Sequence, residues 1–194
     1  MKIFFDTEFT GLRKDTTLIS IGFVTENEQK FYAELYNYND SQVDDWIKKN
    51  VIANLTPIAQ SRSNIENIVK EESYTYVYTG NMTTLANELS EWFGKFDTVE
   101  LVSDVCHYDM VLLIDIFGDA FSLPKNVCPA CYDINHDIMR HFNCTMHEAF
   151  DMNREEILKR YDISIPGITS EIKHNALYDA KVIKALYSFL SSNE

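Results

Sequence analysis

The feature that most constrains this chain is an apolar run near its start that ends abruptly in acidic residues. Ile3 to Phe5 are consecutive apolar residues, and Asp6-Thr7-Glu8 follow them directly. A short apolar run bounded by polar residues predicts a buried strand. Side chains alternate across a strand, so Asp6 and Glu8 face the same way, roughly 6.5–7 Å apart. The sequence therefore predicts two carboxylates aimed together from the end of a strand.

Two acids in this arrangement suit a hard divalent cation, which prefers oxygen ligands and needs neutralising charge close by. The alternative is an ordinary polar strand end that leads into a solvated turn at Thr10-Gly11. Short motifs such as D-x-E often match by accident. The choice between these interpretations therefore depends on the rest of the chain.

The net charge limits what the chain can attract from a distance. It has 17 Lys and Arg against 30 Asp and Glu, a formal charge of −13. This balance argues against broad attraction to nucleic acid or to a membrane surface, so a nucleic-acid substrate would have to be gripped locally. The sequence shows neither a membrane-spanning apolar run nor a charged-then-apolar leader, and we expect a cytoplasmic protein without membrane association.

The N-terminal third predicts antiparallel strands. Leu18 to Val24 and Lys30 to Leu35 have the composition of paired strands, and Glu26-Asn27-Glu28 supplies the turn between them. Together with the strand that carries Asp6 and Glu8, they predict three consecutive antiparallel strands.

Later segments alternate between helix and strand patterns. Apolar spacing, including Trp46, predicts helix within residues 41–70 until Pro57 interrupts it, and residues 83–96 predict a second helix. Residues 74–78 fit either a strand or an exposed loop, and residues 99–102 predict a short strand. With 194 residues, 45% of them hydrophobic, we expect one α/β domain over residues 1–194, whose later strands join the sheet in parallel.

The four cysteines are too few and too unevenly spread for a disulfide scaffold. Cys128, Cys131, His141 and Cys144 have the residue types of a zinc site. However, the last two lie in a segment with a helical apolar pattern of its own. The alternative is a set of buried or half-buried thiols, and the sequence leaves both interpretations open.

A third acid, Asp109, opens a predicted helix and shares its apolar face with Leu112, Leu113 and Ile116. An acid on the core-facing side of a helix needs a cation or a metal as partner. The alternative is an acid favoured by the helix macrodipole. Asp104 is a rival candidate, but its position at a strand end favours a cap or turn role.

A fourth acid, Asp179, lies on the apolar face of the predicted C-terminal helix over residues 173–187. His174 is five residues away, roughly 140° around a helix, so a straight helix could not point both side chains at one spot. We therefore place His174 just before the helix, with Asn175 near its cap. On a loop, the imidazole could act as a base, and neighbouring carboxylates are expected to raise its pKa when no cation is bound. The alternative is a structural or solvated histidine.

Taken together, three motifs resemble the DEDDh family of 3′→5′ exonucleases: FDTEFTGL at residues 5–12, HYD at 107–109 and HNALYDA at 174–180. Within that family the chain is most similar to small single-domain bacterial and phage exoribonucleases. The resemblance implies an RNase H-like fold, a mixed sheet of antiparallel N-terminal strands and later parallel strands flanked by helices. One departure is Ser103-Asp104, where many relatives have His-Asn, which leaves the substrate contact of that Asn without an equivalent.

The resemblance also implies the chemistry. Two Mg²⁺ or Mn²⁺ ions, about 3.5–4 Å apart, would flank the phosphate of the terminal linkage. Asp6 would bridge both ions, Glu8 and Asp179 would complete one, and Asp109 would help to hold the other. His174 would take the proton of the attacking water, and a nucleoside 5′-monophosphate would be released.

Thr10, Gly11 and Leu12 are implied to contact the terminal nucleotide, with an ordinary turn and a core leucine as the alternative. The expected partners are the 3′ ends of single-stranded RNA or DNA, because a base enters such a site only when it is unpaired. A homodimer is compatible with the resemblance, although no stretch identifies an interface. Competing hypotheses are a catalytically inactive nucleic-acid-binding module, a DNA-preferring proofreading-type exonuclease and a zinc-stabilised interaction domain.

Overall fold

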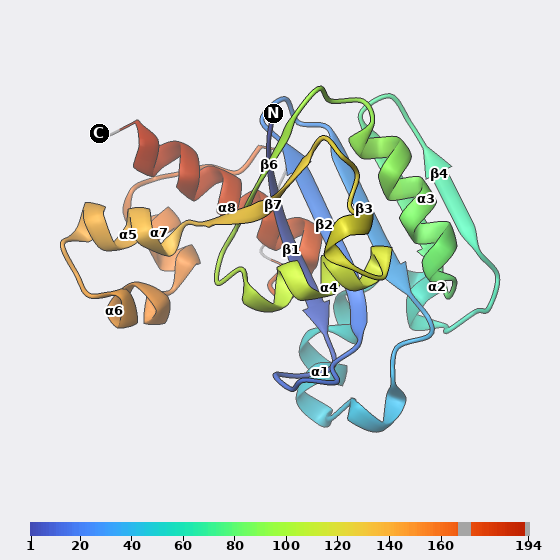
Figure 1. The fold of residues 1–194 in the computed structure, drawn as a ribbon. Helices are drawn as coiled ribbons and strands as arrows, with labels where there is room; N and C mark the ends of the chain where they lie inside the picture. Colours follow the sequence, from blue (N-terminus) through green and yellow to red (C-terminus); the bar gives the residue numbers. More distant parts are fainter. Residues whose placement is uncertain (167–171, 193–194) are drawn as a thin grey trace.

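The computed structural model describes residues 1–166 and 172–192, and its described part is built around a mixed sheet (Figure 1). The seven strands are ordered β4-β5-β3-β2-β1-β6-β7. Their bounds are β1 Lys2–Phe9, β2 Leu18–Thr25, β3 Lys30–Leu35, β4 Asn67–Lys70, β5 Tyr74–Thr79, β6 Val99–Ser103 and β7 Val127–Asp133. The predicted α/β fold with an RNase H-like mixed sheet is confirmed.

The first three strands pair antiparallel, and β6 and β7 extend the sheet in parallel beyond β1. On the other side, β5 pairs in parallel with β3, and β4 pairs antiparallel with β5. The strand carrying the first two acids is therefore central, with neighbours on both sides. Its register with β6 runs from Lys2 opposite Glu100 to Phe4 opposite Val102.

Helices cover both faces of the sheet. On one face Ile3 and Phe5 pack with α3 (Met82–Phe93) and α4 (His107–Phe117). On the other face Phe4 packs with α5 (Asn135–Phe142), α7 (Arg154–Arg160) and α8 (Ala176–Ser191). Figure 1 shows α5, α6 (Met146–Asp151) and α7 gathered beside α8. Alternation along β1 therefore turns Asp6 and Glu8, like Phe4, toward the α8 side.

The start of α8 lies directly on β2. A Cβ added at Gly22 would lie 2.4 Å from the backbone nitrogen of Leu177, so only glycine permits this approach. The contact brings the first turn of α8 close to the sheet, and Asp179 and the preceding His174 are placed by it.

Several sequence predictions are confirmed, including the three antiparallel strands and the helix around residues 83–96. The ambiguous patch at residues 74–78 is strand β5. The helical prediction for residues 41–70 is only partly correct: the segment contains α1 (Asp45–Asn50), α2 (Pro57–Gln60) and the single 3-10 turns Asp40–Gln42 and Ile52–Asn54, but it ends in strand β4. A third 3-10 turn is Ala120–Ser122. Within the described ranges, none of the helices has the length and apolar character needed to cross a membrane.

Candidate active site

The third acid reaches the strand of the first two through hydrogen bonds. Asp109, in the first turn of α4, accepts the backbone N–H of Thr7 at 3.1 Å and the Thr7 hydroxyl at 2.5 Å. The Ser103 hydroxyl, at the end of β6, donates to its other oxygen. The pairing of β6 with β1 ends at Phe4. Beyond that point, the Asp109 carboxylate accepts the backbone N–H that β1 offers at Thr7. This position places it beside Asp6.

The fourth acid and the histidine come from the start of α8. Asn175 is the N-cap residue, and its side chain accepts the backbone N–H of Tyr178 at 3.1 Å. His174 therefore precedes the helix, as predicted, with a left-handed φ of 60°. Asp179 lies in the first helical turn, close enough to Glu8 of β1 for its charge to raise the pKa of Glu8.

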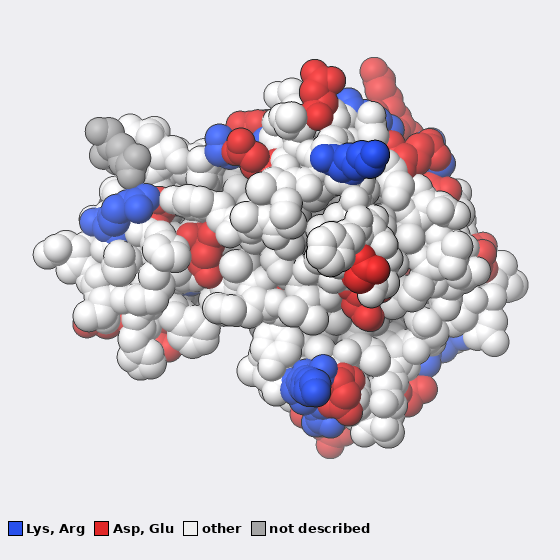
Figure 2. Space-filling view, viewed as in Figure 1, with Lys and Arg blue, Asp and Glu red and all other residues white. Residues whose placement is uncertain are grey.

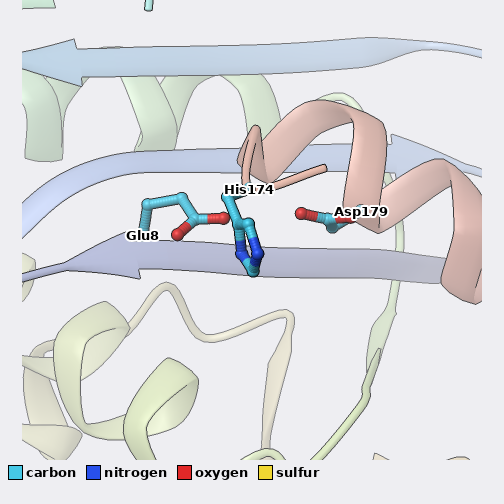
Figure 3. A group of neighbouring side chains, drawn as sticks. All are labelled: Glu8, His174 and Asp179. Carbon is cyan, nitrogen blue, oxygen red and sulfur yellow. The ribbon is translucent and has the colours of Figure 1, made fainter. Parts of the chain in front are cut away.

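Three of the expected residues form a tight cluster (Figure 3). One ligand atom each from Glu8, His174 and Asp179 lie within 4.8 Å of one another, and no other group of three such residues is found in the described part of the chain. In Figure 3 the two carboxyl groups point toward each other, and the imidazole lies across the space between them. Ligands of one Mg²⁺ ion are separated by no more than about 4.2 Å, so a small closure would let the carboxylates of Glu8 and Asp179 share a cation with the imidazole beside it.

Burial raises the pKa of all four acids, and the charge of neighbouring acids raises it further. For Asp6, desolvation raises the pKa most, and the neighbouring charges of Asp109, Asp179 and Glu8 raise it further. Glu8 is raised by burial and by Asp179 and Asp109. Burial raises the pKa of Asp109 to about 7, against the opposing hydrogen bonds from Ser103 and Thr7. Asp6 and Glu8 are therefore close enough to the other acids to be destabilised by them when ionised.

The pKa values of Asp179 and His174 also depend on Glu155 and Lys173. Burial, followed by the charge of Glu155, raises the pKa of Asp179 to about 7. Burial and the charge of Lys173 lower the pKa of His174, and Glu155 opposes this shift. The expectation that neighbouring carboxylates raise the histidine pKa is therefore wrong, because desolvation outweighs their attraction.

Three of the acids, Asp6, Glu8 and Asp179, open into a cleft of about 380 Å³. Asp104, Arg154, Glu155 and Lys173 also line this cleft. Arg154 makes a bidentate ion pair with Asp104, at 2.6 and 2.8 Å. Lys173 pairs with Glu155 at 2.7 Å. Both basic groups of this lining are thus already engaged by acids outside the four. The four acids are left to bind a cation from outside, and a set of carboxylate oxygens fits Mg²⁺ or Mn²⁺.

The loop after β1 begins with a buried residue, Thr10, and continues to an exposed one, Leu12. Thr10 is fully buried, and its hydroxyl donates to Gln42 at 2.5 Å and accepts the Thr17 N–H at 2.8 Å. Gly11 has a φ of 128°, which favours glycine. Leu12 is 80% exposed, so the alternative of a core leucine is wrong.

The candidate zinc ligands do not come together in the described part of the chain. Cys128 is exposed on β7, and the His141 ring packs against Phe142 and Phe189. Cys131 hydrogen-bonds with Cys106 instead. Within the described residues, Cys128, Cys131, His141 and Cys144 therefore supply no three-ligand group.

Sequence reasoning missed residues that reach the cleft from other elements. Glu155 is 7% exposed and is brought to the cleft by α7. Trp46, expected on an apolar helix face, is 54% exposed, and its ring lies 4.9 Å from that of His174. The exposed position of Trp46 could have been suspected only from the acidic residues before it. Nothing in the sequence near Glu155 indicates the cleft.

The comparison with protein families decides the assignment. The chain matches, over residues 1–190, the family described as the 3′-5′ exoribonuclease Rv2179c-like domain. The chain belongs to this family. The 3′-5′ exoribonuclease Rv2179c of Mycobacterium tuberculosis strain H37Rv is 25% identical over 127 residues, covering 66% of this chain and 67% of that protein. The same values hold for the 3′-5′ exoribonuclease MT2234.1 of strain CDC 1551.

Solved structures agree on the fold of this Rv2179c-like domain. A 3′-exonuclease studied for recognition of the histone mRNA stem-loop has a TM-score of 0.64 at 12% identity, covering 99% of this chain and 81% of its own. The nuclease domain of 3′hExo, a DEDDh family member bound to rAMP, has a TM-score of 0.62 at 13% identity, covering 99% and 92%. These structures confirm the fold expected from the resemblance to DEDDh exonucleases, and the family match confirms the assignment to the exonuclease enzymes.

Proposed function

We propose that this Rv2179c-like domain is a metal-dependent exonuclease that removes nucleotides from the 3′ ends of single-stranded RNA, or of single-stranded DNA, as nucleoside 5′-monophosphates. The observation that carries the proposal is the approach of Glu8, His174 and Asp179 to within 4.8 Å. Asp6 lies close enough to Glu8, Asp109 and Asp179 for their charges to raise its pKa. A cluster of acids with raised pKa is typical of a site that binds cations or moves protons.

Asp6, Glu8, Asp109 and Asp179 would hold two divalent cations, Mg²⁺ or Mn²⁺, in this proposal. When bound, the cations would neutralise phosphate charge and lower the pKa of bound water. Ionised carboxylates repel a phosphate. The phosphate would therefore approach these acids only where bound cations balance their charge. Thr7 and Ser103 keep the Asp109 carboxylate turned toward β1 by donating to both of its oxygens.

His174 would accept the proton of the attacking water. Its lowered pKa keeps the imidazole neutral, and therefore able to accept a proton, near neutral pH. His174 precedes α8 and lies across the space between Glu8 and Asp179 (Figure 3). A water bound at these two carboxylates would therefore be next to the base.

Thr10, Gly11 and Leu12 would contact the terminal nucleotide. Leu12 is the exposed apolar side chain of this loop and could pack against a base. Gly11 allows close approach of the backbone. Thr10 holds the loop through its buried hydroxyl, so it would contribute through its backbone.

The charge distribution favours a local grip over long-range attraction. Lys and Arg side chains are interspersed with Asp and Glu on the face shown in Figure 2, and the net charge is −13. The free cysteines suit a reducing compartment such as the cytoplasm, which we include in the proposal. A homodimer is also included, and light scattering of the purified protein tests it.

The function is tested by digesting matched 5′-labelled RNA and DNA oligomers with Mg²⁺, with Mn²⁺ and with a chelator. We expect a ladder that shortens from the 3′ end, faster on RNA, and no digestion with the chelator. Faster digestion of DNA would indicate the proofreading-type alternative. Binding without digestion under any of these conditions would indicate the inactive module.

A further inference from the structure

His174 sits in a backbone conformation that needs external support. Its φ of 60° lies in the left-handed region, which residues with a Cβ adopt uncommonly and at a cost that the surrounding contacts must offset. The turn that contains it, residues 173–175, leads directly into α8. The groups that hold this turn therefore decide where the imidazole lies.

Asn54, the last residue of the 3-10 turn Ile52–Asn54, contacts the chain on both sides of His174. Its side-chain amide donates to the carbonyl oxygen of Lys173 at 2.6 Å. Its own carbonyl oxygen accepts from the side-chain amide of Asn175 at 3.3 Å. The residues before and after the histidine are thus tied to one residue that lies 120 positions earlier in the sequence.

A second support reaches the same turn from the sheet. The Asn175 amide also donates to the Tyr32 hydroxyl at 3.0 Å, and this hydroxyl donates to Glu34 at 2.8 Å. Glu34 is fully buried and also accepts from the Tyr76 hydroxyl at 2.7 Å. Asn175 is therefore anchored to a buried carboxylate on β3.

The imidazole itself meets an aromatic wall from the same segment as Asn54. The Trp46 ring on α1 contacts the His174 ring edge-on, with centroids 4.9 Å apart. Because Asn54 also donates to the carbonyl of Asn50, the last residue of α1, at 2.7 Å, it fixes the turn relative to the helix that carries Trp46. The backbone and ring of His174 are thus held from one side.

We propose that Asn54, assisted by Tyr32, is a positioning residue that holds the Lys173-His174-Asn175 turn so that the imidazole faces Glu8 and Asp179. Asn54 lies outside the cleft lining and acts through the backbone on either side of His174. The inference rests on the proposed function, in which His174 is the base. It adds to that function a residue that neither the motifs nor the metal ligands include.

The test compares Asn54→Ala with Gln60→Ala. Gln60 is a matched control, because its amide donates to the carbonyls of Ala53 and Leu55 at 3.0 and 2.7 Å, on either side of Asn54. We expect Asn54→Ala to lower the single-turnover rate by about 10- to 100-fold, the cost of a misplaced catalytic group. KM and Mn²⁺ affinity should be unchanged, and Gln60→Ala should resemble the wild type.

A double variant separates positioning from general damage. In the His174→Ala background, Asn54→Ala should cause no further loss of rate, because the group that it positions is gone. An equal loss in both backgrounds, or a parallel loss of Mn²⁺ affinity, would overturn the proposal.

A second pair of variants keeps the test independent of how well Asn54→Ala folds. Tyr32→Phe and Tyr76→Phe each remove one hydroxyl from Glu34, but only Tyr32 also reaches Asn175. Comparable stability with a lower rate in Tyr32→Phe alone supports the proposal. Equal rates in the two variants contradict the role of Tyr32.

An activity-independent measurement distinguishes this inference from the proposed function. Nuclear Overhauser contacts between the Trp46 and His174 rings should be present in the wild type and in Gln60→Ala, and weakened in Asn54→Ala. If the wild type digests neither RNA nor DNA but these contacts change as expected, the function is wrong and the positioning stands. If the contacts are the same in all three proteins, the positioning is wrong whatever the activity.

Discussion

Thr7 donates its backbone N–H and its hydroxyl to the same oxygen of Asp109, at 3.1 and 2.5 Å. The relationship joins a strand residue to a helix residue 102 positions later in the sequence. Thr7 lies between Asp6 and Glu8 but on the opposite face of β1. One strand therefore supplies two acids on one face and the support for a third acid at its edge.

Thr7→Val should weaken the site without unfolding it. The variant keeps the backbone N–H bond but removes the hydroxyl, a hydrogen bond to a charged group worth about 1.5–3 kcal/mol. The pKa of Asp109 should rise further, because the Thr7 hydrogen bonds lower it. We expect weaker Mn²⁺ binding by calorimetry and a lower kcat. Thr98→Val, at an exposed position, is the control, and equal Mn²⁺ affinities in the two variants would contradict the role of Thr7.

Asp6→Ala and Asp179→Ala should each nearly abolish hydrolysis while the fold is retained. Each variant removes a proposed ligand from a site that must balance phosphate charge. Without metal, the variants should be as stable as the wild type or more stable, because burial and repulsion disfavour these carboxylates. Asp115→Ala, at an exposed position of α4, should be fully active. Near-wild-type turnover in Mg²⁺ by either variant would refute the assignment of that acid.

In the absence of divalent cations, the protein should lose stability as pH rises from about 4 to 7. Asp109 and Asp179 have a folded pKa of about 7, above the value of about 3.9 expected when unfolded. The folded state then binds more protons than the unfolded state in this window, so the free energy of unfolding falls as pH rises. Urea titrations with a chelator at pH 5 and pH 8 measure this difference.

Added Mn²⁺ should reverse the loss at pH 8, because a ligand that binds the folded state stabilises it. A chelated protein that is equally stable at both pH values, or more stable at pH 8, would show that these acids are not destabilised by the fold.

At saturating metal, the acidic limb of kcat should lie below the ordinary histidine value of about 6.5. Burial and Lys173 lower the pKa of His174, and bound cations would act in the same direction. His174→Ala should lower turnover strongly, remove this limb and leave metal affinity intact. A matching loss of metal affinity would make His174 a ligand instead of a base.

Binding should depend weakly on salt and strongly on the 3′ end. A protein that neutralises Z phosphates of a single strand shows a log–log salt slope of about −0.7Z, and with a net charge of −13 we expect Z on the order of one to three. Affinity should therefore level off beyond a few nucleotides, and a blocked 3′ end should stop digestion where a blocked 5′ end does not. Rates on blocked oligomers of increasing length at two salt concentrations measure both effects. A steep slope, or digestion past a blocked 3′ end, is the contrary outcome.

The sequence by itself determined the strand that carries Asp6 and Glu8, and the position of His174 before the C-terminal helix. These features depend on local rules. Period-two alternation places the two acids on one face, and the 100° advance per helical residue excludes His174 from the helix that carries Asp179. The cap at Asn175 and the strand bounds agree with those rules.

Only the tertiary structure decided how Asp109 is held, what Glu155 and Arg154 do in the cleft, and which residues hold His174. Each of these depends on contacts between segments distant in sequence, such as Asn54 with Lys173, and no local pattern encodes them. The sequence-based prediction of a raised His174 pKa was wrong for the same reason. A sequence motif can predict that acids lie near His174. The desolvation that outweighs their effect on its pKa arises only when the elements pack together.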